Sequence, residues 1–250
     1  MLKFICLGSG SSGNSYFLFS ENYGILIDAG IGIRTLKKHF NTCGLSLKQI
    51  KAVLITHDHA DHVKAVGSLA NEYGIPVYAT ELVHGGIKRN YCVHPKLKEE
   101  NIRFLQKGQT LELDHFVITP FDVPHDSADN VGYSVQYGDV NFCLITDAGH
   151  VTEQFGGYIA QANYLVLEAN HDEDMLMMGP YPAYLKGRIS GDYGHLCFRS
   201  FPPSAILPSN LLNLRLRRLK PASCSAFPAI ISRAFRSVIL CLHLIIRISC

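Results

Sequence analysis

The sequence predicts an α/β protein in which two β-sheets pack face to face between layers of helices. Short β-rich segments follow one another through connections of hairpin length, which argues against a single doubly wound sheet. A strand, helix, strand unit stands in the first third of the chain and indicates a parallel crossover. With 47% hydrophobic and 18% charged residues, the 250-residue chain has the composition of a globular protein with one substantial core.

The N-terminal third alternates strands with helices. The apolar run Leu2 to Leu7 precedes the Gly/Ser loop "GSGSSGNS" and then "YFLFS", a pattern that predicts two strands with a tight connection. A third strand, "YGILIDAG", ends at Asp28, and a helix is expected from Ile33 to Phe40. "KAVLIT" predicts a buried strand, "HVKAVGSLANEYG" a helix closed by Gly74, and "IPVYAT" the next strand.

The middle of the chain predicts strands above all. "FVITPFDV", "VGYSVQYG", "VNFCLITDAG" and "NYLVLEAN" are short β-rich segments separated by polar turns. No apolar run reaches the roughly 18 residues of a membrane span, and the N-terminus lacks a leader pattern, so we expect a cytoplasmic protein without a membrane partner. The eight cysteines are scattered without a CxxC pair and predict reduced thiols.

Charge is distributed unevenly along the chain. Residues 193–250 contain eight Lys or Arg and no Asp or Glu, whereas residues 1–192 contain 15 basic and 21 acidic residues. All 21 glycines fall at or before Gly194. The sequence therefore changes character near Leu196, which predicts a folded domain over residues 1–196 and an aberrant basic and apolar tail over residues 197–250, not natively folded.

A dense histidine cluster follows the predicted buried strand. In "LITHDHADHVKAV", His57, His59, Asp61 and His62 form an H-x-H-x-D-H motif. On an extended backbone alternate side chains face the same way, so the first two histidines can bind one cation while the aspartate and the third histidine face a second. Imidazole and carboxylate ligands suit zinc, manganese or iron. Chance rarely produces such a motif, so it predicts a metal site.

Two further candidate ligands stand at the ends of other predicted strands. His125 follows an apolar strand in "DVPHDSAD", and Asp147 does the same in "CLITDAG". Each taken alone is more typical of an ordinary turn, because Asp before small residues and Gly is common turn chemistry. Beside the cluster, both are expected to complete a two-metal site, since the carboxyl ends of strands are where α/β proteins place their chemistry.

These residues resemble the metallo-β-lactamase superfamily. Asp28 in "LIDAG", the "THDHADH" cluster, His125 and Asp147 occur in the order of that family, over about the first 195 residues. The resemblance implies a four-layer αββα sandwich holding two metal ions. It implies a first ion on His57, His59 and His125, a second on Asp61 and His62, Asp147 between them, and Asp28 accepting a ring N–H from a histidine of the cluster. From the residues alone, Asp28 is equally a turn residue at a strand end.

Local motifs resemble the YycJ/WalJ branch of the superfamily. These motifs are "LGSGSSGNS", "LEANHD", "GPYPAYLKGRI" and "GHL". The resemblance implies a hydrolase of the bacterial cytoplasm that acts on DNA phosphodiesters through a metal-bound hydroxide, as a 5′-to-3′ exonuclease or a related phosphodiesterase. Two rivals stay open. One is a small-molecule thioester or lactone hydrolase of the same fold, which the acidic body favours. The other is a metal-binding protein with impaired or no catalysis.

The same motifs supply candidate residues beyond the ligands. The Gly/Ser loop can offer donors to a phosphate, although a plain hairpin explains it equally well. Basic residues in the "GPYPAYLKGRI" motif can meet a nucleic-acid backbone or simply face solvent. Two histidines can donate a proton to the leaving oxygen, contact the substrate or be structural. The candidate catalytic residues are Asp61, His171 and His195, and the candidate substrate-binding residues are Ser11, Ser12, Asn14, Lys186 and Arg188.

The tail departs from the branch that the first part resembles. In that branch "GHL" continues into "SN", and a later strand ends in "HLS", whose histidine completes the second metal. Here "CFRSFPPSAILPSN" follows, and the expected region, Lys220 to Phe227, contains no histidine. We therefore expect a weakened second metal site. Three explanations stay open for the tail. It is a translated frameshift or assembly error, a membrane-surface element, or a folded replacement that uses His243 as the ligand.

Overall fold

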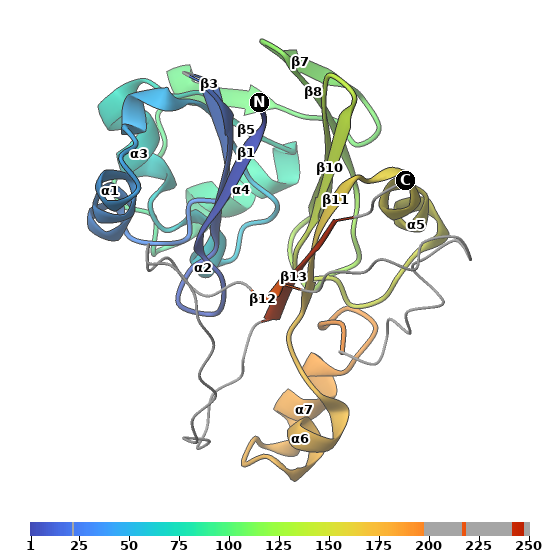
Figure 1. Ribbon diagram of the computed structural model, residues 1–250. Helices are drawn as coiled ribbons and strands as arrows, with labels where there is room; N and C mark the ends of the chain where they lie inside the picture. Colours follow the sequence, from blue (N-terminus) through green and yellow to red (C-terminus); the bar gives the residue numbers. More distant parts are fainter. Residues whose placement is uncertain (22, 198–216, 219–241, 248–250) are drawn as a thin grey trace.

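Two mixed β-sheets face each other in the computed structural model, which describes residues 1–21, 23–197, 217–218 and 242–247 (Figure 1). The first sheet follows the chain order: β1 (Lys3–Gly8), β2 (Ser15–Ser20), β3 (Tyr23–Ile27), β4 (Ile50–Leu54), β5 (Val77–Ala79) and β6 (Ile102–Phe104). The second sheet contains β7 (Leu111–Leu113), β8 (Phe116–Asp122), β9 (Val131–Tyr137), β10 (Val140–Ile145), β11 (Tyr164–Ala169), β12 (Arg217–Arg218) and β13 (Leu242–Arg247). Its spatial order, among the described residues, is β12-β13-β11-β10-β9-β8-β7.

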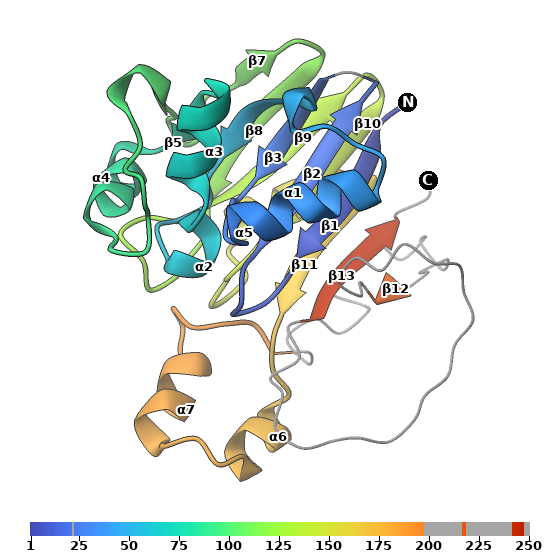
Figure 2. The ribbon, with the colours of Figure 1, turned by 90° about the vertical axis from the view of Figure 1, so that its left-hand side faces the viewer.

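Helices cover the outer faces of both sheets (Figures 1 and 2). The α-helices are α1 (Ile33–Thr42), α2 (Ala60–Val63), α3 (Val66–Tyr73), α4 (Glu81–Arg89), α5 (Glu153–Gln161), α6 (Glu173–Met178) and α7 (Ala183–Ile189). Two short 3₁₀ turns occupy Leu47–Gln49 and Glu99–Asn101. The helices α1, α3 and α4 share an apolar core with the first sheet, and α5 shares another with the second. The order of layers is therefore helix, sheet, sheet, helix, as predicted.

Strand β2 shows how the sequence builds these layers. Successive side chains of a strand point to opposite faces. Phe17 and Phe19 pack in the core beneath the helices, whereas Tyr16 and Leu18 pack in the core between the sheets. Because all four side chains are buried, the strand reads as a continuous apolar run.

The predicted strands and the parallel crossover are confirmed, since β4 pairs in parallel with β5. The single helix expected over residues 62–74 is wrong, because the chain forms α2 and α3 with a break between them. At the break, the N–H of Ala65 donates to the carbonyl of Ala29, and the N–H of Ala29 donates to the carbonyl of His62. The second helix ends as expected at Gly74, which has a positive φ of 64°.

Part of the tail joins the second sheet. Strand β13 pairs antiparallel with β11, and in this register His243 stands opposite Glu168. Apart from Cys197, β12 and β13, the tail lies outside the described residues, and this includes Lys220 to Phe227. The predicted boundary at residue 196 therefore stays a prediction. Within the described ranges, no helix has the length and apolar character needed to cross a membrane. Of the cysteines in those ranges, Cys6, Cys92 and Cys143 are free thiols.

Candidate metal centre

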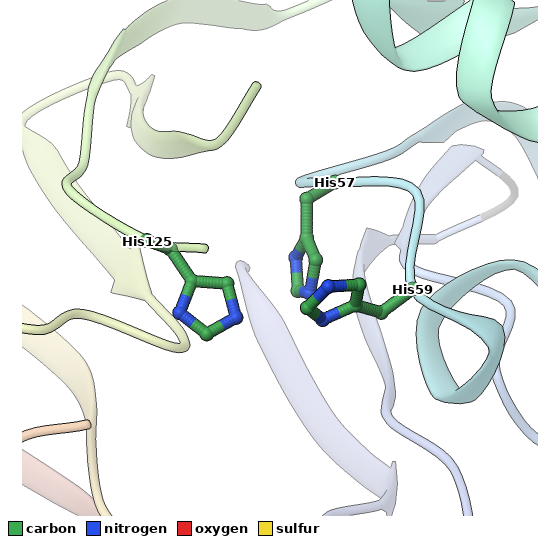
Figure 3. Close-up of side chains that lie close together, drawn as sticks. All are labelled: His57, His59 and His125. Atoms are coloured by element: carbon green, nitrogen blue, oxygen red, sulfur yellow. The ribbon is translucent and has the colours of Figure 1, made fainter. Parts of the chain in front are cut away.

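The histidine cluster lies at the carboxyl end of β4, where the two sheets bring separate parts of the chain together. His57 and His59 follow β4, and His125 follows β8 of the other sheet. Their rings face one another (Figure 3), with centroids 4.6 Å apart between His57 and His59 and 5.0 Å apart between His57 and His125. Ligand atoms of the three residues lie within 4.8 Å of one another. The three histidines therefore form a group able to hold one metal ion.

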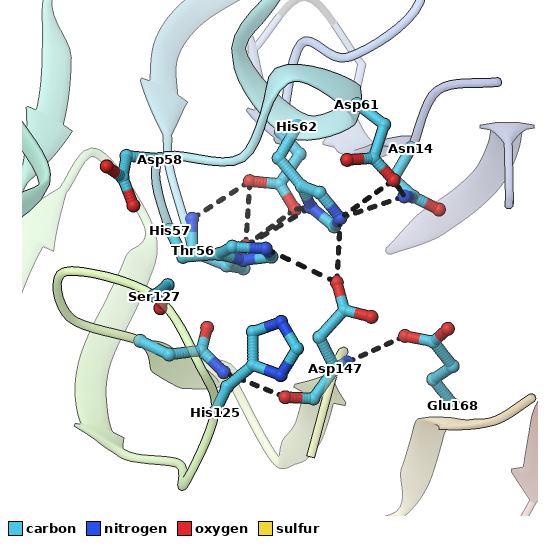
Figure 4. A network of polar contacts seen from close by, with 12 residues as sticks. Asn14, Thr56, His57, Asp58, Asp61, His62, His125, Ser127, Asp147 and Glu168 are labelled. Carbon is cyan, nitrogen blue, oxygen red and sulfur yellow. Dashed lines mark hydrogen bonds and ion pairs between the residues drawn. The ribbon is translucent and has the colours of Figure 1, made fainter. Parts of the chain in front are cut away.

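A second group surrounds Asp147, which follows β10 (Figure 4). The Nε2 atom of His62 lies 2.8 Å from Oδ2 of Asp147, and Nε2 of His57 lies 3.4 Å from the same oxygen. Ligand atoms of these three residues also lie within 4.8 Å of one another. Asp61 stands nearby, with Oδ2 3.8 Å from Nε2 of His62. Asp147 is thus next to both candidate positions.

Buried acceptors hold the outer nitrogens of two histidines. Asp28 Oδ2 lies 2.8 Å from Nδ1 of His62. The hydroxyl of Thr56 donates to Asp28 and lies 3.0 Å from Nδ1 of His57. An Nδ1–H that is held in this way leaves the Nε2 lone pair free for a metal ion. The geometry is the one that metal-binding histidines adopt.

Unpartnered nitrogens test whether the group suits a cation. His125 is held in the same manner, with Nδ1 3.1 Å from the carbonyl oxygen of Gly194. In the part of the chain that the structure describes, Nε2 of His57, Nε2 of His125 and Nδ1 of His195 are buried and make no well-aligned hydrogen bond, although each lies within 3.4 Å of a carboxylate oxygen. Buried polar atoms rarely lack partners, and a metal ion supplies the missing interaction. The residues therefore fit the predicted metal ions.

Electrostatics put His57 and Asp147, but not His62, in the protonation state that binds a metal ion. Burial, together with the nearby charge of His62, lowers the pKa of His57 well below its usual value. Burial by itself would raise the pKa of Asp147, but His62 and His195 hold it well below its usual value. Burial opposes charge on His62 as well, yet Asp28 and Asp147 raise its pKa well above the usual value. His57 is thus neutral and Asp147 ionised at neutral pH.

Of the two histidines predicted to be catalytic, His195 lies in the centre. Its Nδ1 is 3.0 Å from Oδ1 of Asp147, and it forms a third possible ligand group with Asp147 and His125. His171 is buried close by, and burial together with the charge of His195 lowers its pKa. Among the described residues His171 belongs to none of the ligand groups.

The Gly/Ser loop divides into an exposed and a buried part. Ser11 and Ser12 are exposed in the turn between β1 and β2. Asn14 is only 3% exposed, and its Nδ2 lies 2.9 Å from Nε2 of His62. The three loop residues predicted to bind substrate therefore occupy different surroundings, and one of them contacts a candidate ligand.

The two predicted basic contacts have protein partners. Nζ of Lys186 donates to the carbonyl oxygen of Met177, and Nε of Arg188 donates to Asp126. Asp126 is itself 3.3 Å from Nε2 of His125. Binding of a nucleic acid by Lys186 and Arg188 stays a prediction. It would require each cation to share its present partner with a phosphate or to exchange that partner for one.

Several residues that the sequence left without a role hold the candidate ligands in place. Oε2 of Glu168 accepts the backbone N–H of Asp147 at 2.6 Å, and Nδ2 of Asn130 donates to the carbonyl of Asp147 at 3.1 Å. Thr56 links Asp28 to His57 as described above. A sequence signal existed for Glu168 and Thr56, since both are polar residues at the end of an apolar strand beside a candidate motif.

Gly30 packs so closely against the metal centre that a side chain at this position is expected to displace it. A Cβ at this position would lie 1.6 Å from the carbonyl oxygen of Asp61, so Gly30→Ala must push the start of α2 away. We expect a loss of about 3 kcal/mol in unfolding free energy and weaker zinc binding, measured by urea unfolding and metal titration. Gly187→Ala is the control, because nothing lies within 4 Å of its Cβ. Unfolding of Gly30→Ala at wild-type urea concentration would contradict the close approach.

Comparison with known proteins places the chain in a family. A family model for the beta-lactamase superfamily domain matches residues 23–199. Exodeoxyribonuclease YycJ of Bacillus anthracis is 33% identical over 196 residues, which cover 78% of this chain and 73% of the relative. Exodeoxyribonuclease WalJ of Streptococcus pneumoniae strain D39 is 34% identical over 194 residues, which cover 78% of this chain and 72% of the relative. The resemblance to the YycJ/WalJ branch is thus confirmed.

A solved structure agrees at the level of the fold. The metallo-beta-lactamase fold protein YhfI from Bacillus subtilis superimposes with a TM-score of 0.58 at 21% identity, covering 78% of this chain and 77% of that protein. The predicted α/β sandwich with two sheets between helices is therefore the metallo-β-lactamase fold. By its sequence match and its fold, the chain belongs to the beta-lactamase superfamily.

Proposed function

We propose that this metallo-β-lactamase-fold hydrolase cleaves the phosphodiester bonds of DNA, as a 5′-to-3′ exonuclease of the bacterial cytoplasm. The convergence of three histidines and Asp147 from the ends of different strands is the observation that carries the proposal. The two similar exodeoxyribonucleases support DNA as the substrate class. The same relatives favour phosphodiester cleavage over antibiotic hydrolysis.

In this proposal the centre binds two divalent ions, zinc or manganese, with iron as a third choice. Such ions lower the pKa of bound water and stabilise the negative charge that develops on phosphate oxygens. The proposed ligands are His57, His59 and His125 for the first ion, Asp61 and His62 for the second, and Asp147 for both. The first position has three histidines, whereas the second lacks the histidine of the resembled branch, so we propose that the second ion is held more weakly.

Other residues have proposed roles that the ions do not supply. Asp28 holds Nδ1–H of His62 and so fixes the ring orientation. His195 is the proposed proton donor, because Nδ1 faces Asp147 while 24% of the side chain stays exposed to solvent. The exposed hydroxyls of Ser11 and Ser12 are proposed donors to a phosphate.

Substrate choice tests the proposal directly. The metal-free protein is reloaded with manganese or zinc and incubated with 5′-labelled single- and double-stranded DNA, and separately with thioester and lactone substrates. We expect release of label from the DNA, loss of this activity on adding a chelator, and no turnover of the small esters. Turnover of a thioester or lactone without DNA degradation would overturn the proposal.

That rival outcome has a physical basis. Residues 1–192 carry six more acidic than basic residues, whereas a protein that binds nucleic acid usually presents a basic face. A second rival has its own signature. A chain that binds one tight ion and turns over neither substrate class would be a metal-binding protein without catalysis, as the altered tail allows.

A further inference from the structure

Asn14 brings an amide group to the position proposed for the second ion. Its Nδ2 lies 2.9 Å from Nε2 of His62 and 3.4 Å from Oδ2 of Asp61 (Figure 4). Asn14 is only 3% exposed, so bulk water does not screen these polar groups from one another. The nitrogen through which His62 would bind an ion therefore faces an N–H donor of the Gly/Ser loop.

The orientation of this amide is fixed from its other side. Oδ1 of Asn14 accepts the backbone N–H of Gly10 at 2.8 Å and the hydroxyl of Tyr16 at 3.4 Å. A rotated amide would turn its NH₂ group toward the N–H of Gly10, which places two donors against each other. The contacts of the loop thus keep the NH₂ group, and not the oxygen, toward His62.

The backbone holds Asn14 in place as firmly as its side chain. Its N–H donates to the carbonyl of Asp61 at 2.7 Å, and its carbonyl accepts from Gly30 at 2.8 Å. The residue is therefore tied to the segment that carries the second ion's proposed ligands. Moving the amide away from His62 requires either a change of rotamer against these neighbours or a change in the loop.

We propose that Asn14 limits occupancy of the second metal position. A cation at this position is attracted by Asp61 and Asp147, but it meets the positive end of the Asn14 amide dipole, whose Nδ2 lies 2.9 Å from Nε2 of His62. The inference rests on the two-ion centre of the proposed function and assigns the loop residue a role in metal selection instead of phosphate binding. Ion binding then requires the amide to give up its contact with His62.

Two substitutions separate the parts of this argument. Asn14→Asp keeps an oxygen for Gly10 and replaces the NH₂ group by an oxygen that can bind the ion, so the second ion should bind at least about tenfold more tightly. Asn14→Ala removes the NH₂ group that faces the ion and adds no new ligand. It should increase the affinity for the second ion by about threefold. Ser12→Asp adds the same charge to the exposed part of the loop and should change the affinity by less than about twofold.

The measurement is calorimetric titration of the metal-free full chain with zinc and with manganese, which resolves a second binding step. Circular dichroism and thermal unfolding of each variant report whether it is folded. If the added carboxylate prevents Asn14→Asp from folding, Asn14→Ala still tests the proposal. Weaker second-ion binding in Asn14→Ala, an unchanged affinity in both variants, or an equal gain in Ser12→Asp would overturn the proposal. Because no DNA is present, failure here leaves the proposed nuclease activity to its own assay.

Discussion

His59→Ala is expected to abolish tight binding of the first ion and, with it, DNA degradation. The three histidine rings meet at centroid distances between 4.6 and 5.1 Å, so removal of one leaves two imidazoles and a shared carboxylate around the ion. Loss of a partner that only orients a ligand costs about 10–100-fold in metal affinity. Loss of the ligand itself should exceed about 100-fold, measured by metal analysis after dialysis and by zinc titration.

His115→Ala is the matched control for this experiment. His115 is an exposed histidine in the turn between β7 and β8, with 76% of its side chain accessible, and it belongs to none of the ligand groups among the described residues. The control should keep metal content, DNA degradation and stability. Full metal occupancy in His59→Ala would show that the ligand assignment is wrong.

Asp28→Asn is expected to weaken the second ion and destabilise the fold together. The carboxylate is fully buried and accepts from the N–H and hydroxyl of Thr56 and from Nδ1 of His62. An amide has one oxygen, so its NH₂ group must face either Thr56 or His62. Facing His62, it forces the ring proton onto Nε2 and removes the lone pair that binds metal.

The expected cost is about 2–4 kcal/mol in unfolding free energy and about 10–100-fold in affinity for the second ion. Urea unfolding and zinc titration measure the two effects. Asp114→Asn is the control, because Asp114 has a similar positive φ, 54° against 58° for Asp28, but lies in a surface turn. Wild-type metal affinity in a folded Asp28→Asn would refute the orienting role.

Much of the fold followed from local patterns along the chain. Short β-rich segments bounded by polar turns made the strands recognisable. Gly74 marked the end of a helix, because its positive φ suits glycine. The H-x-H-x-D-H spacing and the positions of His125 and Asp147 after apolar strands indicated the ligand set, since strand ends of an α/β fold meet at one edge.

Local patterns failed where distant segments compete for the backbone. The helix expected over residues 62–74 breaks because the carbonyl of Ala29, just after β3, accepts the N–H of Ala65 between α2 and α3, a contact that no helical propensity describes. Lys186 looked free to meet a phosphate, yet the carbonyl of Met177 accepts its Nζ. Both outcomes depend on packing between residues that the sequence does not place side by side.

The sequence by itself determined which chemical groups this protein has, because residue type and spacing decide what can bind a metal ion. The tertiary structure alone decided which groups oppose or assist that binding. His195 reaches Asp147 and Asn14 reaches His62 only through the packing of loops against strand ends, at sequence separations of 48 residues in each case. Hydrogen-bond orientation at a buried atom depends on every neighbour at once, so it becomes defined only when the fold is complete.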